Sequence, residues 1–120
     1  MADLEQLLDK YRQNARIHYE VGFRDKASVR KGNRAASQMI RIAQQVEEEF
    51  SGGVDAFAGL LVERDYKIDC WAAFHLIEQM NISQQLQQKA LAVIERYARS
   101  DDIDAAGIQL WLKGWNKKQR

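Results

Sequence analysis

The residues that could do chemistry in this chain are few, and they are His18, His75 and Cys70. His75 lies one helical turn before Glu78, and a His–Glu pair at this spacing is used in the carboxylate-bridged metal sites of helical bundles. Those sites need a second such pair on another helix, and the sequence has none. Neither histidine stands at the spacing of a zinc motif. We therefore expect no metal site and no cofactor.

Nucleophilic catalysis is not indicated either. Cys70 and His75 are five residues apart, so they point to different sides of one helix and cannot form a local dyad. The chain has no GxSxG elbow and no glycine-rich phosphate loop. His18 falls on the apolar side of the first predicted helix and is expected to be a core histidine. We expect a protein that is not an enzyme, with Cys70 as a small apolar filler in a reducing compartment.

The segment that carries Cys70 and His75, Asp65 to Met80, predicts a helix with apolar side chains on almost every side. Such a helix must be covered, and no apolar run is long enough to cross a membrane, so the cover must come from other helices. A chain of 120 residues is normally one domain with its own core. The first residues show neither a basic leader nor an apolar run, so we expect no secretion signal and a cytoplasmic location.

Helical spacing of the apolar residues predicts six helices. The first starts at Asp3 and ends between residues 22 and 32, at Gly22 or at the turn Lys31-Gly32-Asn33. The second covers about Asn33 to Phe50 and stops at Ser51-Gly52-Gly53. The others are expected over about 54–63 and from Asp65, then after a cap at Asn81 or Ser83, and after a cap at Ser100 to Asp102. Residues 1–120 are read as a single helical domain with a short flexible basic tail from about residue 116.

Taken in pairs, the helices make about three hairpins of roughly forty residues, close to the period of HEAT and armadillo units. We expect an all-α fold of three stacked helical hairpins; an irregular helical bundle is the alternative. The segment Ile68 to Ile77 resembles the second helix of a HEAT-type unit. With Gly32-Asn33 and the segment Ala105 to Trp115, it is similar to a family of small bacterial proteins of unknown function with an armadillo-like fold, over about residues 15–115. The resemblance implies that fold and a bacterial origin, and it brings no catalytic residue with it.

The charges of the second helix stand in the order that opposes its dipole. Lys31 and Arg34 lie at its positive end and Glu47 to Glu49 at its negative end. If the first two helices form an antiparallel hairpin, cations gather at one end of it and acids at the other. The cations are Arg24, Lys26, Arg30, Lys31 and Arg34, and the acids are Asp3, Glu5, Glu47 to Glu49, and Asp55. Charge runs of this kind also occur on helix faces that are only solvated, and that interpretation stays open.

These features favour a non-enzymatic protein–protein interaction module, such as an adaptor or a protein that neutralises a toxin. The expected partner-binding residues are the five cations and Trp115, whose place before the polar tail suits a half-exposed anchor, whereas Trp71 and Trp111 are expected in the core. The alternative is a nucleic-acid-binding helical repeat protein that uses the same basic end. A balance of 18 basic and 17 acidic residues speaks against a dedicated polyanion binder. We expect no membrane partner, and the sequence indicates no oligomeric state.

Overall fold

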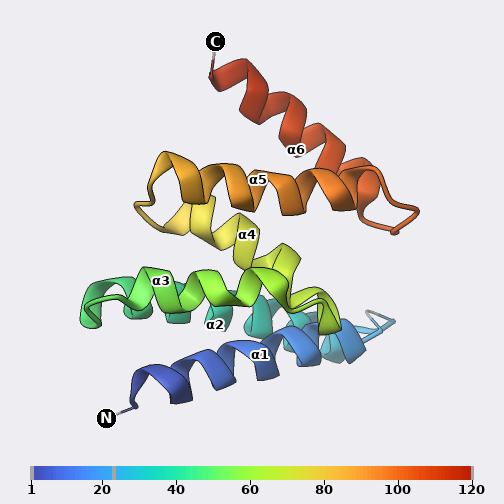
Figure 1. The fold of residues 1–120 in the computed structure, drawn as a ribbon. Helices are drawn as coiled ribbons and strands as arrows, with labels where there is room; N and C mark the ends of the chain where they lie inside the picture. The colour runs from blue at the N-terminus through green and yellow to red at the C-terminus, as the bar shows by residue number, and fades with distance from the viewer. Residues whose placement is uncertain (1, 23, 120) are drawn as a thin grey trace.

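The computed structural model describes residues 2–22 and 24–119. Within these ranges the protein is all-helical, with six α-helices and two short 3-10 helices (Figure 1). In chain order the elements are α1 (Leu4–Glu20), α2 (Lys26–Glu49), α3 (Gly53–Ala58), η1 (Gly59–Val62), η2 (Asp65–Lys67), α4 (Ile68–Gln79), α5 (Gln84–Ala98) and α6 (Ala105–Lys118). The expectation of an all-α fold is confirmed.

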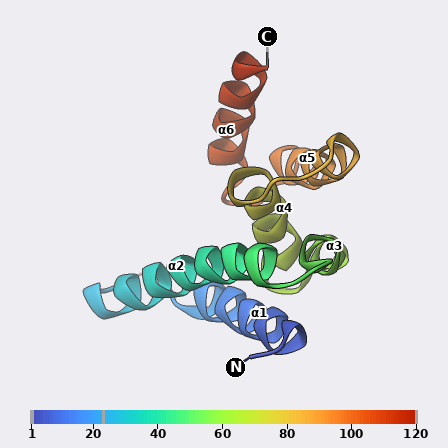
Figure 2. The same cartoon turned by 90° about the vertical axis from the view of Figure 1, so that its left-hand side faces the viewer.

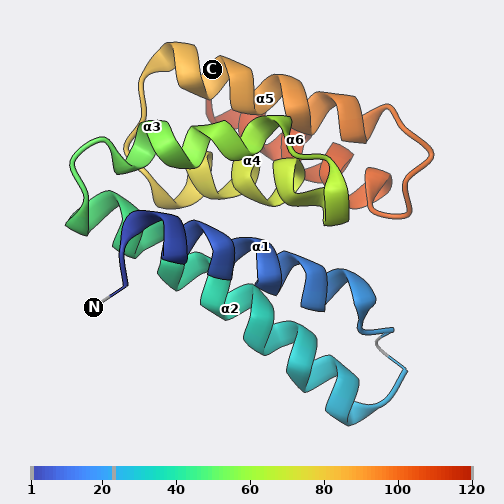
Figure 3. The ribbon, with the colours of Figure 1, turned by 60° about the horizontal axis from the view of Figure 1, so that its bottom comes forward.

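The helices form three layers that follow one another in chain order (Figures 1 and 2). α1 and α2 pack as an antiparallel hairpin (Figure 3), α3 and α4 form the middle layer, and α5 and α6 form the last. α4 lies at the centre, in contact with α1, α2, α3 and α5, whereas α6 packs mainly on α5. The two termini therefore lie at opposite ends of the stack (Figure 1).

The central helix α4 is covered, as its composition predicts. Ile68 is 3% exposed, and Ala72, Ala73 and Leu76 are fully buried at 0%. On the side facing α1, Trp71 is partly buried and packs edge-on against His18, with 4.8 Å between the ring centroids. Because apolar side chains on several sides of α4 need cover, the elements around it are held in one core.

The boundary between the first two helices differs from the prediction. α1 begins with a capping box between Asp3 and Gln6 and ends at Glu20, before Gly22. α2 begins at Lys26 rather than Asn33, because Asp25 accepts a hydrogen bond from the backbone N–H of Ser28 at 2.8 Å and caps the helix. Residues 31–33 are therefore helix interior, and the turn expected there is wrong; Gly32 is buried within the helix.

The stop after α2 is confirmed. Gly52 has a φ of 74°, in the left-handed region that glycine adopts without a steric penalty. At Gly53 an added Cβ would lie 2.1 Å from the carbonyl oxygen of Val46, so α3 starts in direct contact with the end of α2. The helix expected over about 54–63 is two pieces, α3 and then the 3-10 helix η1.

The start of α4 is Ile68 and not Asp65, because two residues before it are left-handed. Tyr66 has a φ of 53° and Lys67 a φ of 58°, which residues other than glycine seldom adopt. Lys67 is held there by two ion pairs, from its Nζ to Asp102 Oδ1 at 2.7 Å and to Asp104 Oδ2 at 3.0 Å. The loop between α5 and α6 thus fixes the entry to the central helix.

The last two helices correct two further expectations. Ser83 is the cap of α5, accepting from the N–H of Leu86 at 3.2 Å. α6 starts at Ala105 rather than directly after Asp102, because Asp102 accepts from the Asp104 N–H at 2.9 Å and from Lys67 instead of capping the helix. α6 also continues to Lys118, so residues 116–118, expected as the start of a loose tail, are helical. Arg120, the end of that expected tail, lies outside the described residues.

Candidate interaction surface

The five predicted cations lie together at the loop end of the α1–α2 hairpin. Arg24 stands just before α2, and the early start of the helix places Lys26, Arg30, Lys31 and Arg34 on its first turns. All five side chains are exposed. The antiparallel packing of α1 and α2 puts this end away from the acidic end of the hairpin, as the sequence predicts (Figure 3).

Four of the exposed cations of α2 form a ridge. Lys26, Arg30 and Arg34 follow each other at four-residue spacing, and Arg41 continues the same side of the helix two turns later. At 1.5 Å per residue this basic ridge, defined by these four residues, is about 22 Å long. Its length suits contact with an extended surface or a helix of another molecule.

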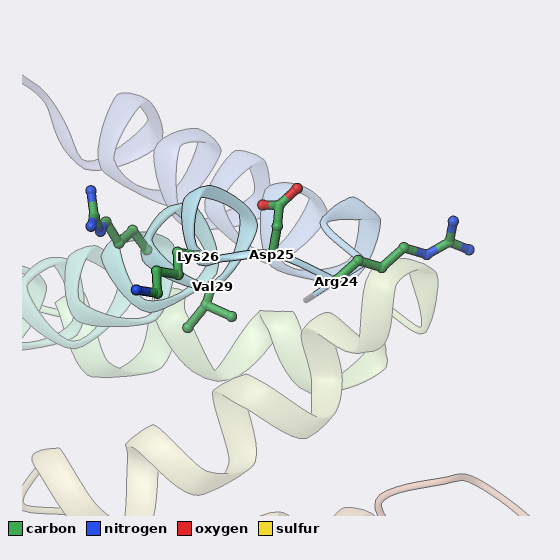
Figure 4. Close-up of a pocket in the computed structure, with 5 residues that line it drawn as sticks. Arg24, Asp25, Lys26 and Val29 are labelled. Atoms are coloured by element: carbon green, nitrogen blue, oxygen red, sulfur yellow. The ribbon is translucent and has the colours of Figure 1, made fainter.

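A shallow hollow of about 440 Å³ opens at the start of the ridge, lined by Arg24, Asp25, Lys26, Val29 and Arg30. Figure 4 shows Arg24 extending away from Lys26 and Val29, so the cations spread around the helix start instead of converging on one point. Asp25 is the one acid in the lining, and its carboxylate is engaged by the Ser28 N–H, which lowers its pKa. The arrangement suits a broad acidic surface better than a single small anion.

The cations of this end have no acidic partner among the residues that the structure describes. Within residues 2–22 and 24–119, Arg24, Lys26, Arg30, Lys31 and Arg34 form neither an ion pair nor a side-chain hydrogen bond. The cations that do form ion pairs stand elsewhere, and they are Arg12, Arg16, Lys67 and Arg96. The first turn of α2 also lacks an acidic residue, so the positive end of its dipole faces its own cations.

The acidic end of the hairpin is different, because donors of the protein itself form hydrogen bonds with carboxylates there. Glu47 Oε2 accepts a hydrogen bond from the backbone N–H of Asn81 at 2.6 Å, and Glu49 Oε2 accepts one from Gln45 Nε2 at 3.0 Å. Asp3 caps α1. Donors of the protein thus compensate acids at the C-terminal end of α2, and at its N-terminal end the capping carboxylate of Asp25 faces the dipole.

Trp115, the sixth predicted binding residue, belongs to the C-terminal part of α6. Figure 1 shows α6 at the opposite end of the stack from the α1–α2 hairpin. The Trp115 ring stacks on Trp111 with 5.6 Å between centroids and 7° between planes. Trp111 in turn packs edge-on against Phe74 of α4 at 4.9 Å. All three are partly buried, so these rings hold α6 against α4, and the structure does not join Trp115 to the five cations.

Two buried polar groups in the core were not anticipated from the sequence. The Tyr11 hydroxyl and His75 Nδ1 are 2.6 Å apart in a buried hydrogen bond. Asp69, 0% exposed, pairs with Arg96 and accepts hydrogen bonds from the Tyr97 hydroxyl at 2.7 Å and the Cys70 N–H at 2.8 Å. A carboxylate inside an otherwise apolar helix was the available signal, because such a group requires donors from neighbouring helices.

Burial shifts the pKa values of His75, Tyr11 and Cys70 toward the neutral forms of these side chains. Burial lowers the pKa of His75 to about 4, and burial also raises the pKa of Tyr11 well above its usual value. Burial, with a smaller contribution from the Asp69 charge, raises the pKa of Cys70 to about 12. At neutral pH the thiol is protonated and a poor nucleophile. The hydrogen bond between Tyr11 and His75 joins α1 to α4.

Within the described residues, no group of three or more His, Cys, Asp and Glu side chains is placed to hold a metal ion. Glu78, the expected neighbour of His75 in a metal site, is exposed, whereas His75 is buried. None of the helices in these ranges combines the length and apolarity that a membrane crossing needs. No family model matches the chain, and no curated protein or solved structure is significantly similar to it. The resemblance to an armadillo-like bacterial family stays a prediction.

Proposed function

We propose that this protein is a non-enzymatic, cytoplasmic interaction module that uses the basic ridge, with Arg24 and Lys31 beside it, to bind an acidic surface of another protein. The single observation that carries the proposal is this row of exposed cations on α2, which form no ion pair within the residues that the structure describes. An adaptor and a toxin-neutralising protein both fit this class. Cys70, a buried free thiol, suits a reducing compartment.

The energetics favour a bound state for this end of the molecule. A cation in the first turn of a helix costs about 0.3–1 kcal/mol through the dipole, and Lys26 occupies that turn, next to the capping carboxylate of Asp25. Acidic groups of a partner would remove this cost and gain from the other cations along the ridge. The binding energy would therefore include relief of a cost that the free protein carries.

Nucleic acid is the alternative occupant of the same end. It is supported by Tyr19, which is 60% exposed near the C-terminal end of α1 and could stack on a base. Tyr19 already packs against Tyr66 with 5.7 Å between ring centroids, and Arg16 lies over the Tyr66 ring. We favour an acidic protein because these aromatic rings are engaged with one another and the formal net charge is only +1.

The test compares two triple variants of the full chain with equal charge change. One reverses the ridge end, with Arg30→Glu, Lys31→Glu and Arg34→Glu. The control reverses three exposed cations on other elements, Lys10→Glu, Arg64→Glu and Lys89→Glu. Tagged proteins are used to capture partners from a cell extract with and without nuclease treatment. Affinity for each purified partner is then measured by calorimetry at two salt concentrations.

We expect the ridge triple to weaken partner binding about tenfold or more, with less salt dependence, while the control triple binds as the unmodified protein does. Equal binding by both triples would refute the proposal. Capture that disappears on nuclease treatment, together with salt-dependent retention on a labelled duplex, would favour the nucleic-acid alternative. Lys26→Glu should weaken binding and raise the free energy of unfolding by about 0.3–1 kcal/mol, which separates loss of binding from loss of folding.

A further inference from the structure

α6 belongs to the last layer of the stack, and the side of α6 that faces away from the other helices is exposed. Its inward side is formed by Ala105 and Ile108, which are 8% and 7% exposed, with the ring of Trp111 partly buried. The opposite side carries Ala106, Gly107, Leu110, Lys113, Gly114 and Lys117, all exposed. These six residues, here called the α6 outer face, recur at three- and four-residue spacing and so form one stripe along the helix.

Leu110 is the apolar centre of this face and is 72% exposed. Around it lies a hollow of about 520 Å³, lined by Leu110, Lys113, Gly114, Asn116 and Lys117. A single exposed leucine is ordinary on a protein surface. Leu110, however, lies in a depression and between two glycines of the same stripe. An ordinary surface leucine needs neither of these features.

The two glycines are not explained by folding. Gly107 and Gly114 lie inside a helix, where glycine costs about 0.5–1 kcal/mol relative to alanine. Neither has a positive φ, and a Cβ added at either would meet no atom within 4 Å. Gly53 shows the opposite case, where a backbone carbonyl occupies the Cβ position. On the α6 outer face, small residues leave room for the backbone of another helix to approach from outside.

The charge of α6 selects the partner. Residues 105–119 include Lys113, Lys117 and Lys118 and no aspartate or glutamate. The first two lysines line the hollow around Leu110. A second copy of the chain docked through the same face would bring its lysines against these, which is unfavourable. An amphipathic helix with a small apolar face and acidic flanks is complementary to both the shape and the charge.

From this arrangement we infer that the α6 outer face is a second docking surface, and that its occupant is an acid-flanked amphipathic helix of another protein. The face lies on the last layer of the stack, and the basic ridge lies on the first (Figures 1 and 2). The two surfaces can therefore bind separate molecules at the same time. The protein would then join an acidic surface at one end to an acidic helix at the other.

The probe for this surface is a synthetic fluorescent peptide of about five helical turns, with alanine and leucine on one side and glutamate on both flanks. A second peptide has lysine in place of each glutamate. Binding to the full chain is followed by fluorescence anisotropy. We expect the acidic peptide to bind and the basic peptide to bind at least about tenfold more weakly. Equal binding of the two peptides would overturn the inference.

Two variants locate the binding. Gly107→Gln with Gly114→Gln keeps α6 helical and fills the space that the partner backbone would occupy. It should weaken binding of the acidic peptide at least about tenfold without lowering the unfolding midpoint in urea. The matched control is Gly59→Gln, because Gly59 is also exposed with nothing within 4 Å of an added Cβ. Unchanged binding by the double variant would overturn the inference.

Two further measurements distinguish other possible occupants of the α6 outer face. If sedimentation shows a dimer that Leu110→Glu dissociates, the face joins two copies of this chain and the inference is wrong. The triple variant of the basic ridge should bind the acidic peptide as the unmodified protein does. Failure of the ridge proposal and failure of this one are therefore separate results.

Discussion

The buried pair Tyr11–His75 makes stability depend on pH in a range where few other groups titrate. Burial holds the pKa of His75 at about 4 in the folded protein, whereas the ordinary value of 6.5 applies to the unfolded chain. As the pH falls below about 6.5, His75 becomes protonated in the unfolded chain, whereas in the folded protein it stays neutral until about pH 4. Stability is therefore highest above pH 6.5 and falls as the solution is acidified.

The size of the loss follows from the two pKa values. Between pH 7 and pH 5 the unfolded state gains about 2 kcal/mol relative to the folded state from this residue alone. Burial also lowers the pKa of His18, so His18 adds a loss in the same direction. The pKa values of Asp25 and Asp102 are held below 3.8, and their contributions disappear at lower pH. The window from pH 7 to pH 5 thus isolates the histidines.

The assay is urea unfolding of the full chain, followed by circular dichroism at several values between pH 7 and pH 5. We expect the unmodified protein to lose about 2 kcal/mol or more over this range. His75→Gln keeps a side chain that can form a hydrogen bond with the Tyr11 hydroxyl, and it should remove most of the loss. His18→Gln, the matched control, should keep most of the loss and remove only the smaller contribution of His18. A His75→Gln protein with the full pH dependence, or an unmodified protein that is more stable at pH 5, would refute the account.

Two further changes test how the layers are joined. Gly53→Ala places a Cβ 2.1 Å from the Val46 carbonyl oxygen and should lower the free energy of unfolding by about 3 kcal/mol. The control is Gly59→Ala, whose Cβ has nothing within 4 Å and which should lower the free energy of unfolding little or not at all. Similar urea midpoints for the two variants would contradict this expectation. Arg96→Met keeps the length of the side chain but leaves the carboxylate of Asp69 buried without its cation. The free energy of unfolding should therefore fall by about 3 kcal/mol. A fall of less than about 1 kcal/mol would show that the fold does not depend on this ion pair.

Helix type and number were predictable because apolar spacing is a local property of the chain. The covered helix α4 and the glycine stop at residues 51–53 follow from side-chain type alone. The start of α2 was misjudged because a glycine inside a helix and a glycine after one look alike in sequence. The start of α2 is set by the Asp25 cap, which stabilises a helix that begins at Lys26 more than Gly32 disfavours its continuation. The left-handed pair Tyr66 and Lys67 was out of reach, since contacts from a distant loop hold it.

The candidate surface was predictable only in part. The clustering of five cations needed nothing beyond an antiparallel hairpin, and the structure has that hairpin. That the ridge lacks acidic partners depends on every acid in the chain, which no local pattern reports. The α6 outer face was not predicted, because the spacing of apolar residues does not by itself show which side of α6 faces its neighbours. Trp111 and Trp115 occupy the side toward α4, and Leu110 turns outward as a result.

The placement of ion pairs in this fold bears directly on how the basic ridge should be interpreted. Arg12 donates through two nitrogens to Glu63 and joins α1 to the segment after η1. Lys67 joins the entry of α4 to the loop before α6, and Arg96 joins α5 to the buried Asp69 of α4. Three of the paired cations therefore connect different layers, at positions where a broken pair would loosen the stack. The ridge, by contrast, sets several cations along the dipole-disfavoured end of one long helix, where they form no ion pair within the described ranges. In line with the proposed function, the acidic counterpart of this row of cations would lie in another molecule.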